Sequence, residues 1–245
     1  MKIALIADIH GNLPAMEAVL RDIETQGVNR IICLGDMVGK GPKSRAAIDL
    51  CRQNCDEIVI GNWEHGLFRD FARLTGGDTR DISERARWFM REIGEERMEY
   101  VGALPHSTEF AFGGKLVRLF HAHPLNFNRY FPNSPLEQRM ELFGSAESSE
   151  EKRAADVAVY ADIHTPYIQT LSERRLVNIG SVGNPLDIPR ASYVVVEDGG
   201  EETDIQLVRV DYDIDRAVEL AWQCQTPDLE GYITELRTAK YFRRG

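Results

Sequence analysis

Short apolar runs alternate with helical patterns along the first quarter of the chain. Residues 2–7, 30–34 and 57–60 are rich in aliphatic side chains and have the length of buried strands. Between them, residues 14–25 and 44–54 carry apolar side chains at helical spacing, with Pro14 suited to a first turn and Gly27 to a helix end. This alternation predicts parallel strands joined by crossover helices. The polar loops then lie at the carboxyl ends of the strands, where open α/β sheets bind ligands.

The stretch 64–104 interrupts this rhythm with three helical patterns, at 64–73, 82–93 and 96–103. We interpret it as a helical, cap-like insertion within a single domain that spans residues 1–245. A hairpin at 108–112 and 115–120 follows, with Gly113-Gly114 as its turn. The polar, partly helical stretch 126–153 begins with an aromatic-rich segment, 126–131, which we expect to face a substrate. Further strands are predicted at 156–160, 167–170, 174–178, 192–196 and 203–210, before a helix at 214–223 and a polar helical tail.

Composition narrows the class of protein. The chain has 245 residues, of which 43% are apolar, enough to bury the core of one α/β domain. A net charge of −10 argues against a sequence-independent grip on nucleic acid, although bound metal ions can still attract a phosphorylated substrate. The four cysteines form no CxxC pair, which fits a reducing compartment. Because the apolar run before Asp8 is too short for a signal peptide or a membrane span, we expect a cytoplasmic protein without a membrane partner.

Polar side chains with oxygen or nitrogen donors stand at or near the ends of the apolar runs. There are six of them: Asp8, His10, Asp36, Asn62, His121 and His164. Each motif alone is weak, since Gly-Asp and Gly-Asn are ordinary turn chemistry and a lone His is more often structural. Their order is informative, because donors on adjacent strand ends converge on one volume. These donor types suit Mn²⁺, Fe or Zn²⁺.

In these motifs the chain resembles the calcineurin-like metallophosphoesterases. The matching segments run from residue 8 to residue 183, about three quarters of the chain. They are Asp8-Ile9-His10-Gly11-Asn12, Gly35-Asp36-Met37-Val38-Gly39-Lys40-Gly41-Pro42, Gly61-Asn62-Trp63-Glu64, His121-Ala122-His123-Pro124, Ile163-His164-Thr165-Pro166 and Asn178-Ile179-Gly180-Ser181-Val182-Gly183. The first and last segments look like the small bacterial and archaeal branch, which includes phosphodiesterases and diadenosine-polyphosphate hydrolases. The resemblance implies an α/β fold, a two-sheet αββα sandwich.

The resemblance also implies two divalent metal ions. Asp8, His10 and His164 would hold the first ion, and Asn62 and His121 would hold the second. The carboxylate after the second strand would bridge both. In such centres the ions lie ~3.5–4 Å apart, share a nucleophilic hydroxide and neutralise the phosphoryl oxygens.

That bridging carboxylate is Asp36, which we therefore name as catalytic as well as metal-binding. Its negative charge can serve two cations and offset their repulsion. The implied substrate is a small phosphorylated molecule: a phosphodiester, a nucleotide or a dinucleoside polyphosphate.

The chain departs from the family pattern at Trp63, where a histidine commonly stabilises the transition state and protonates the leaving oxygen. An indole has one N–H donor and no titratable proton in this range, so Trp63 cannot be a general acid. General acid catalysis is typically worth ~10²–10⁴-fold. We therefore hypothesise a preference for substrates with good leaving groups, such as phosphoanhydrides or aryl esters.

Two histidines lie close enough in sequence to replace that histidine, and one arginine is a separate candidate for phosphate contact. His65 lies two residues beyond Trp63 and is expected to be an exposed helix residue. His123 lies two residues from His121, and alternate residues of an extended segment point the same way. It is either a catalytic, substrate-contacting residue or a bystander. Arg190 is a candidate for phosphate binding, although a lone arginine is usually a solvated surface residue.

The second departure is Asp162, at a position where the family commonly has a histidine that binds the second ion. A carboxylate can replace that ligand, but it is shorter, harder and negative. We therefore expect Asp162 to be a metal ligand that shifts the second site toward Mn²⁺, Fe²⁺ or Mg²⁺ and away from Zn²⁺. For the centre as a whole we expect Mn²⁺, Fe or Zn²⁺, with Mn²⁺ favoured. The alternative is that Asp162 faces away and the second site is weak or empty.

Two functions fit this sequence. The first is a metal-dependent phosphoric ester hydrolase, a phosphodiesterase or phosphatase. The alternative is a non-catalytic metal-binding scaffold or protein-interaction module on the same fold, which Trp63 and Asp162 keep open. The six intact ligand positions favour the enzyme, because a binding module has no chemical need for the full set. The sequence names neither the substrate nor the oligomeric state.

Overall fold

The computed structural model describes residues 1–145, 152–198 and 203–242. Its first sheet contains β1 (Lys2–Ile6), β2 (Arg30–Cys33), β3 (Glu57–Ile58), β9 (Ala191–Asp198) and β10 (Thr203–Val210), in the order β10-β9-β1-β2-β3. The predicted parallel pairing holds for β1, β2 and β3, whereas β9 runs antiparallel to β1. The carboxyl ends of β1, β2 and β3 therefore meet at one edge.

The second sheet is also mixed and five-stranded. It contains β4 (Ser107–Phe112), β5 (Lys115–Phe120), β6 (Val157–Tyr160), β7 (Tyr167–Leu171) and β8 (Arg174–Asn178), in the order β4-β5-β6-β8-β7. The expected hairpin is β4–β5, and β5, β6 and β8 run parallel. The ends of β5 and β6 thus contribute loops to a single edge as well.

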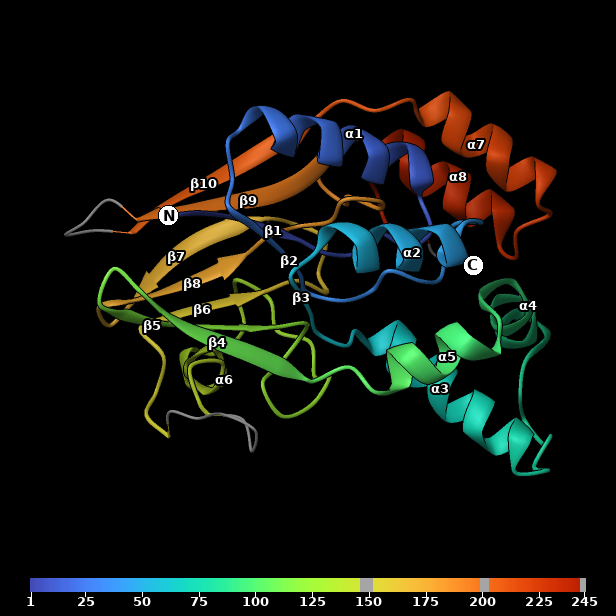
Figure 1. Ribbon diagram of the computed structural model, residues 1–245, viewed down its shortest axis with the longest axis horizontal. Helices are drawn as coiled ribbons and strands as arrows, with labels where there is room; N and C mark the ends of the chain where they lie inside the picture. Colours follow the sequence, from blue (N-terminus) through green and yellow to red (C-terminus); the bar gives the residue numbers. More distant parts are fainter. Residues whose placement is uncertain (146–151, 199–202, 243–245) are drawn as a thin grey trace.

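Helices cover both outer faces of the sheet pair (Figure 1). The first sheet is covered by α1 (Leu13–Thr25), α2 (Ser44–Asn54), α7 (Ile214–Gln223) and α8 (Leu229–Thr238). The short α6 (Leu136–Glu141) lies on the far side of the second sheet, and α3 (Asn62–Thr75), α4 (Glu84–Ile93) and α5 (Glu95–Gly102) lie together at one end. This arrangement confirms the predicted αββα sandwich. No helix among the described residues has the length and apolarity needed to cross a bilayer.

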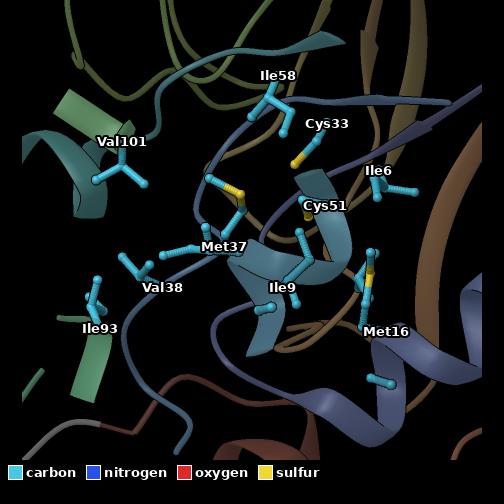
Figure 2. Packing of buried hydrophobic residues seen from close by; sticks show 14 of the residues in the cluster. Ile6, Ile9, Met16, Cys33, Met37, Val38, Cys51, Ile58, Ile93 and Val101 are labelled. Atoms are coloured by element: carbon cyan, nitrogen blue, oxygen red, sulfur yellow. The ribbon is translucent and has the colours of Figure 1, made fainter. Parts of the chain in front are cut away.

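The core has two layers because side chains alternate across a strand. From β1, Ile3 and Leu5 pack between the two sheets, while Ile6 packs on the helix side. The helix-side layer also takes in Ile9 and Val38, from the loops after β1 and β2 (Figure 2). Both are fully buried. The loops that carry the candidate ligands are therefore anchored by apolar side chains.

Among the element boundaries that differ from expectation, two bear on the site. The strand expected at 57–60 ends at Ile58, because the N–H of Ile60 leaves the sheet to donate to the carbonyl of Pro105 at 2.8 Å. The helix expected from residue 64 begins at Asn62, capped by Gly61. Asn62 therefore lies in the first turn of α3 and not in a free loop. Of the polar stretch 126–153, residues 146–151 lie outside the described part of the chain.

Candidate metal centre

The loops at this edge bring the candidate ligands into one buried cluster. Oδ1 of Asp8 lies 3.7 Å from Nε2 of His10, 3.4 Å from Nε2 of His164 and 3.9 Å from Nε2 of His121. Oδ2 of Asp36 lies 3.6 Å from Nε2 of His10 and 3.5 Å from Nε2 of His121. Two groups have the mutual spacing needed for a metal ion: Asp8, His10 and His164, and Asp8, Asp36 and His121.

Backbone carbonyls orient the three imidazoles of the cluster. Nδ1 of His10 contacts the carbonyl of Val38 at 2.9 Å, and Nδ1 of His121 contacts that of Leu34 at 2.7 Å. Nδ1 of His164 contacts the carbonyl of Asn184 at 2.6 Å. A carbonyl only accepts, so each Nδ1 carries a hydrogen and each ring turns its Nε2 inward. This is how proteins hold histidines that bind a metal.

Several polar side chains are crowded together in the cluster. Oδ1 of Asp8 is buried and has no hydrogen-bond partner in the structure. The side-chain amide of Asn62 faces Nε2 of His121 at 2.9 Å and lies 3.2 Å from carboxylate oxygens of both Asp36 and Asp162. Burying so many polar groups together is costly unless a cation compensates them. The imidazole, carboxylate and amide donors therefore fit divalent metal ions.

The backbone is left-handed at five of the candidate residues, none of which is glycine. The φ angles lie between 49° and 63° at Asp8, His10, Asp36, Asp162 and His164. Such conformations cost roughly 1–3 kcal/mol each and persist where the surroundings over-determine them. Five such residues in one cluster indicate that backbone strain is stored at the candidate site.

Hydrogen bonds between neighbouring loops hold this strained backbone in place. The carbonyl of Asp8 accepts from the N–H of Gly183 at 2.9 Å and from Oγ of Ser181 at 2.8 Å. The N–H of His10 donates to the carbonyl of Asp36 at 2.9 Å. The loop after β8 thus supports the loop after β1, which in turn supports the loop after β2.

Glu64 is a buried residue of this support that the sequence did not single out. Its carboxylate accepts from the backbone N–H groups of Asp36 at 2.8 Å, Val38 at 3.0 Å and Gly61 at 3.0 Å. Burial and the neighbouring Asp36 carboxylate raise its pKa to about 7. The spacing Gly61-x-x-Glu64 is that of a capping box, which was the available signal. A Cβ at Gly61 would come within 2.2 Å of Oδ1 of Asp36, so only glycine fits there.

Burial and neighbouring charges shift the pKa values of the titratable groups in the cluster. Burial, with a contribution from His164, holds the pKa of His10 well below its ordinary value, so this ring is neutral. Burial also opposes charge on Asp8 and His121, but in both cases the opposite charges outweigh it. The pKa of Asp8 falls to about 2, and the pKa of His121 rises well above its ordinary value because of Asp36 and Asp8. A protonated His121 carries a positive charge at the place where a metal ion would bind.

A cleft of about 740 Å³ opens beside the cluster. Lys40, Trp63, Arg85 and Arg129 line one side, and the C-terminal segment 227–242 lines the other. The Trp63 ring stands edge-on to His10 with centroids 5.8 Å apart, and the Arg85 guanidinium lies 4.7 Å over the indole. Through Trp63 the lining of the cleft contacts one of the candidate ligands.

Residues 1–199 match the sequence profile described as the calcineurin-like phosphoesterase superfamily domain. The chain belongs to this superfamily. Membership confirms the expected family and, with it, the expected metallophosphoesterase type of hydrolase. The uncharacterized protein MJ0912 of Methanocaldococcus jannaschii is 30% identical over 260 residues, covering 94% of this chain and 95% of that protein.

Solved structures share the fold over the whole length of the chain. A metallophosphoesterase from Sphaerobacter thermophilus superposes with a TM-score of 0.77 at 24% identity, covering 98% of this chain and 100% of the other. The hypothetical protein PH1004 from Pyrococcus horikoshii OT3 gives a TM-score of 0.77 at 20% identity, covering 98% and 99%. The C-terminal strand and helices beyond residue 199 therefore have counterparts in these folds.

Of the predicted residues outside the metal-spaced groups, His123 and Arg190 have partners of their own. His123 is 7% exposed, accepts from the N–H of Leu125 at Nδ1 and stacks on Tyr130 with centroids 5.5 Å apart. Burial lowers its pKa, and its buried Nε2 has no hydrogen-bond partner in the structure. Arg190 donates to both carboxylate oxygens of Asp211, at 2.7 and 3.1 Å, on the exposed surface. None of its recorded contacts reaches the cluster.

Asp162 lies at the cluster but has another strong partner. Its backbone N–H donates to Oδ2 of Asp8 at 3.1 Å, and its Oδ1 lies 3.9 Å from Nε2 of His121. Both carboxylate oxygens accept from Arg129, at 2.7 and 2.8 Å. Arg129 belongs to the segment expected to face a substrate, yet nothing in its spacing distinguished it from a surface arginine.

Proposed function

We propose that this protein is a two-metal phosphoesterase that hydrolyses a small phosphodiester, nucleotide or dinucleoside polyphosphate. The observation that carries the proposal is the buried convergence of three Nε2 atoms and two carboxylates, each aimed at a common centre. Six residues would hold the two ions: Asp8, His10, Asp36, Asn62, His121 and His164. We favour Mn²⁺, with Fe or Zn²⁺ as alternatives, because the donors mix imidazole with hard oxygen.

When bound, two divalent ions supply Lewis acidity towards the phosphoryl oxygens and a water activated for attack. The protein's own contribution is positioning. The carbonyls behind His10, His121 and His164 fix the rings, while Glu64 ties the loop that carries Asp36 to the start of α3. The chain thus supplies a preorganised centre beside a cleft of about 740 Å³.

This centre has no obvious residue to protonate the leaving oxygen. Trp63 is packed against His10 and Arg85 and has no titratable proton. We therefore propose a preference for phosphoanhydrides and aryl esters, whose leaving oxygens need little protonation. Measuring kcat/KM across leaving groups of graded pKa tests this preference, and a flat dependence would contradict it.

Several expectations stay predictions. His123 stays a candidate catalytic or substrate-binding residue, because its buried Nε2 has no hydrogen-bond partner in the structure. Replacing His123 with Asn would show whether kcat depends on this side chain. The single domain with a helical cap at about 64–104 is our interpretation of α3 to α5. The cytoplasmic location and the absence of nucleic-acid partners rest on the sequence, and no oligomeric state is assigned.

One assay separates this proposal from a non-catalytic scaffold. The Mn²⁺-loaded protein is tested on bis-p-nitrophenyl phosphate, p-nitrophenyl phosphate and diadenosine tetraphosphate, with Asp36→Ala as the control. We expect turnover of at least one substrate and its loss in the variant, whose folding is checked by circular dichroism. No turnover of any of the three would favour the scaffold.

A further inference from the structure

Arg129 places a guanidinium at the mouth of the metal cluster. Its Nε donates to Oδ2 of Asp162 at 2.7 Å, and its Nη2 donates to Oδ1 at 2.8 Å. The pairing is side-on and bidentate, the geometry that orients a guanidinium most strictly. The arginine side chain is 52% exposed and lines the cleft, whereas the aspartate side chain is 3% exposed. A buried carboxylate thus holds a cation that faces solvent.

Asp162 is itself fixed by the cluster. Its backbone donates to Oδ2 of Asp8, and its Oδ1 lies 3.2 Å from the side-chain amide of Asn62 and 3.9 Å from Nε2 of His121. The Arg129–Asp162 pair is therefore built on residues that would hold the metal ions. The Arg129 guanidinium therefore lies beside the residues that would hold the ions and also lines the cleft.

Part of the guanidinium is left over for a ligand. An arginine has five N–H donors, and the pair with Asp162 uses one on Nε and one on Nη2. Among the described residues, no hydrogen bond is recorded for Nη1. The remaining donors form a fork suited to two oxygens of a phosphoryl group.

The other cationic side chains that line the cleft contact partners away from the metal cluster. Nζ of Lys40 donates to Oε2 of Glu235 at 2.7 Å, a contact in which both side chains are mostly buried. The Arg85 guanidinium lies over Trp63 and forms an ion pair with Asp228 at 3.0 Å. Trp63 itself offers no charge. Since charge on the phosphoryl oxygens must be stabilised during transfer, Arg129 is the best-placed side chain to do so.

We propose that Arg129 binds the phosphoryl group cleaved at the metal centre, and that Asp162 is the positioning residue of Arg129 and not a metal ligand. This inference rests on the proposed function and deepens it. One pair of residues then accounts for both departures from the family pattern. The aspartate at 162 serves the arginine, and the arginine supplies a donor that the indole at 63 cannot.

The test compares Arg129→Ala, Asp162→Asn and the double variant. Arg97→Ala is the matched control, because Arg97 makes the same side-on pair with Asp49, at 2.8 and 2.8 Å, between α5 and α2. Each protein is loaded with Mn²⁺. Three quantities are measured: bound metal by mass spectrometry, the Kd of inorganic phosphate by calorimetry, and kcat on bis-p-nitrophenyl phosphate.

We expect Arg129→Ala and Asp162→Asn to keep the wild-type metal content and to bind phosphate at least about tenfold more weakly. Their kcat should fall about 10²–10³-fold, the usual loss for one transition-state donor. The double variant should lose no more phosphate affinity or kcat than either single variant, because each single substitution already breaks the Arg129–Asp162 pair. Added guanidinium should partly restore Arg129→Ala. Arg97→Ala should match the wild type in all three measurements.

Two results would overturn the inference. Loss of an ion in Asp162→Asn, with full metal content in Arg129→Ala, would make Asp162 a ligand. Unchanged phosphate affinity in Arg129→Ala, or no phosphate binding by the wild type, would remove Arg129 from the site. Metal content and phosphate affinity need no turnover, so they decide this inference even if the proposed hydrolysis fails. Turnover that is lost in Asp36→Ala but intact in Arg129→Ala would overturn this inference alone.

Discussion

Nε2 of His10 lies 3.1 Å from Nε2 of His164. Both rings have their Nδ1 atoms committed to backbone carbonyls, so two lone pairs point at each other in a fully buried space. Oδ1 of Asp8 faces the same space, 3.4 Å from Nε2 of His164. A positive charge between these atoms would stabilise the arrangement. The geometry is that of residues able to share a bound cation.

Removing the metal should lower stability. A ligand that binds only the folded state stabilises it by about 2.7 kcal/mol at a free concentration of 100 times Kd. We expect chelation to lower Tm by several degrees and added Mn²⁺ to restore it, as measured by calorimetry. An unchanged Tm, after mass spectrometry has shown that the metal is gone, would contradict this account of the cluster.

Metal binding should release protons. The carboxylates of Asp36 and Asp8 raise the pKa of His121 well above its ordinary value, so the metal-free protein holds a proton there at neutral pH. A cation must displace that proton, and its affinity should therefore rise with pH until the pH passes the raised pKa of His121. Calorimetric titration in two buffers of different ionisation enthalpy measures the released protons. Equal heats in both buffers would mean that His121 is already neutral.

Glu64→Gln should weaken both the fold and the metal centre. The amide can present its oxygen to some of the three backbone N–H groups, but its own N–H₂ then faces another donor. Each buried N–H left unsatisfied costs about 1–3 kcal/mol. Urea unfolding should show a loss of that size, together with weaker metal binding. Glu17→Gln, on the exposed face of α1, is the control and should behave as wild type.

The helix α8 lies beyond the residues that match the family profile, and we expect it to affect the metal affinity of one site. Oε2 of Glu235 accepts from Nζ of Lys40 at 2.7 Å and from Nδ2 of Asn184 at 3.1 Å. The carbonyl of Asn184 in turn accepts from Nδ1 of His164. We expect Glu235→Ala to weaken binding of the ion at His164 about 10-fold or more. This is the usual effect of losing a residue that helps to orient a metal ligand.

The control for this helix is Glu230→Ala, an exposed position on the same α8. It should leave both metal affinities unchanged. If both variants weaken binding equally, the effect comes from the helix as a whole. If neither does, the contact through Asn184 has no influence on the ligand.

Much of the fold follows from periodicity in the sequence. The apolar runs before Asp8, Asp36 and Asn62 became parallel strands whose carboxyl ends meet, as the alternation with helices predicted. His121 and His164 follow strands of the second sheet, so the sandwich brings their loops to the same edge. These residues could be named because their place in the pattern determines their place in the fold.

Other features depend on contacts that no local pattern encodes. Arg129 follows no strand and has no partner within a helical or strand spacing; it meets Asp162, 33 residues away, through the packing of two loops. Asn184 and Glu235 are joined across 51 residues. The left-handed backbone at Asp8 arises from hydrogen bonds between loops, because its residue type alone favours an ordinary conformation.

The most direct test of the central claim is the number of metal ions bound per chain. The protein is loaded with Mn²⁺, freed of excess metal by gel filtration and measured by mass spectrometry, beside His164→Ala and Asp36→Ala. The account predicts two ions in the wild type, one in His164→Ala and fewer than two in Asp36→Ala. A folded wild-type protein that retains no metal, or variants that retain the full complement, would contradict it.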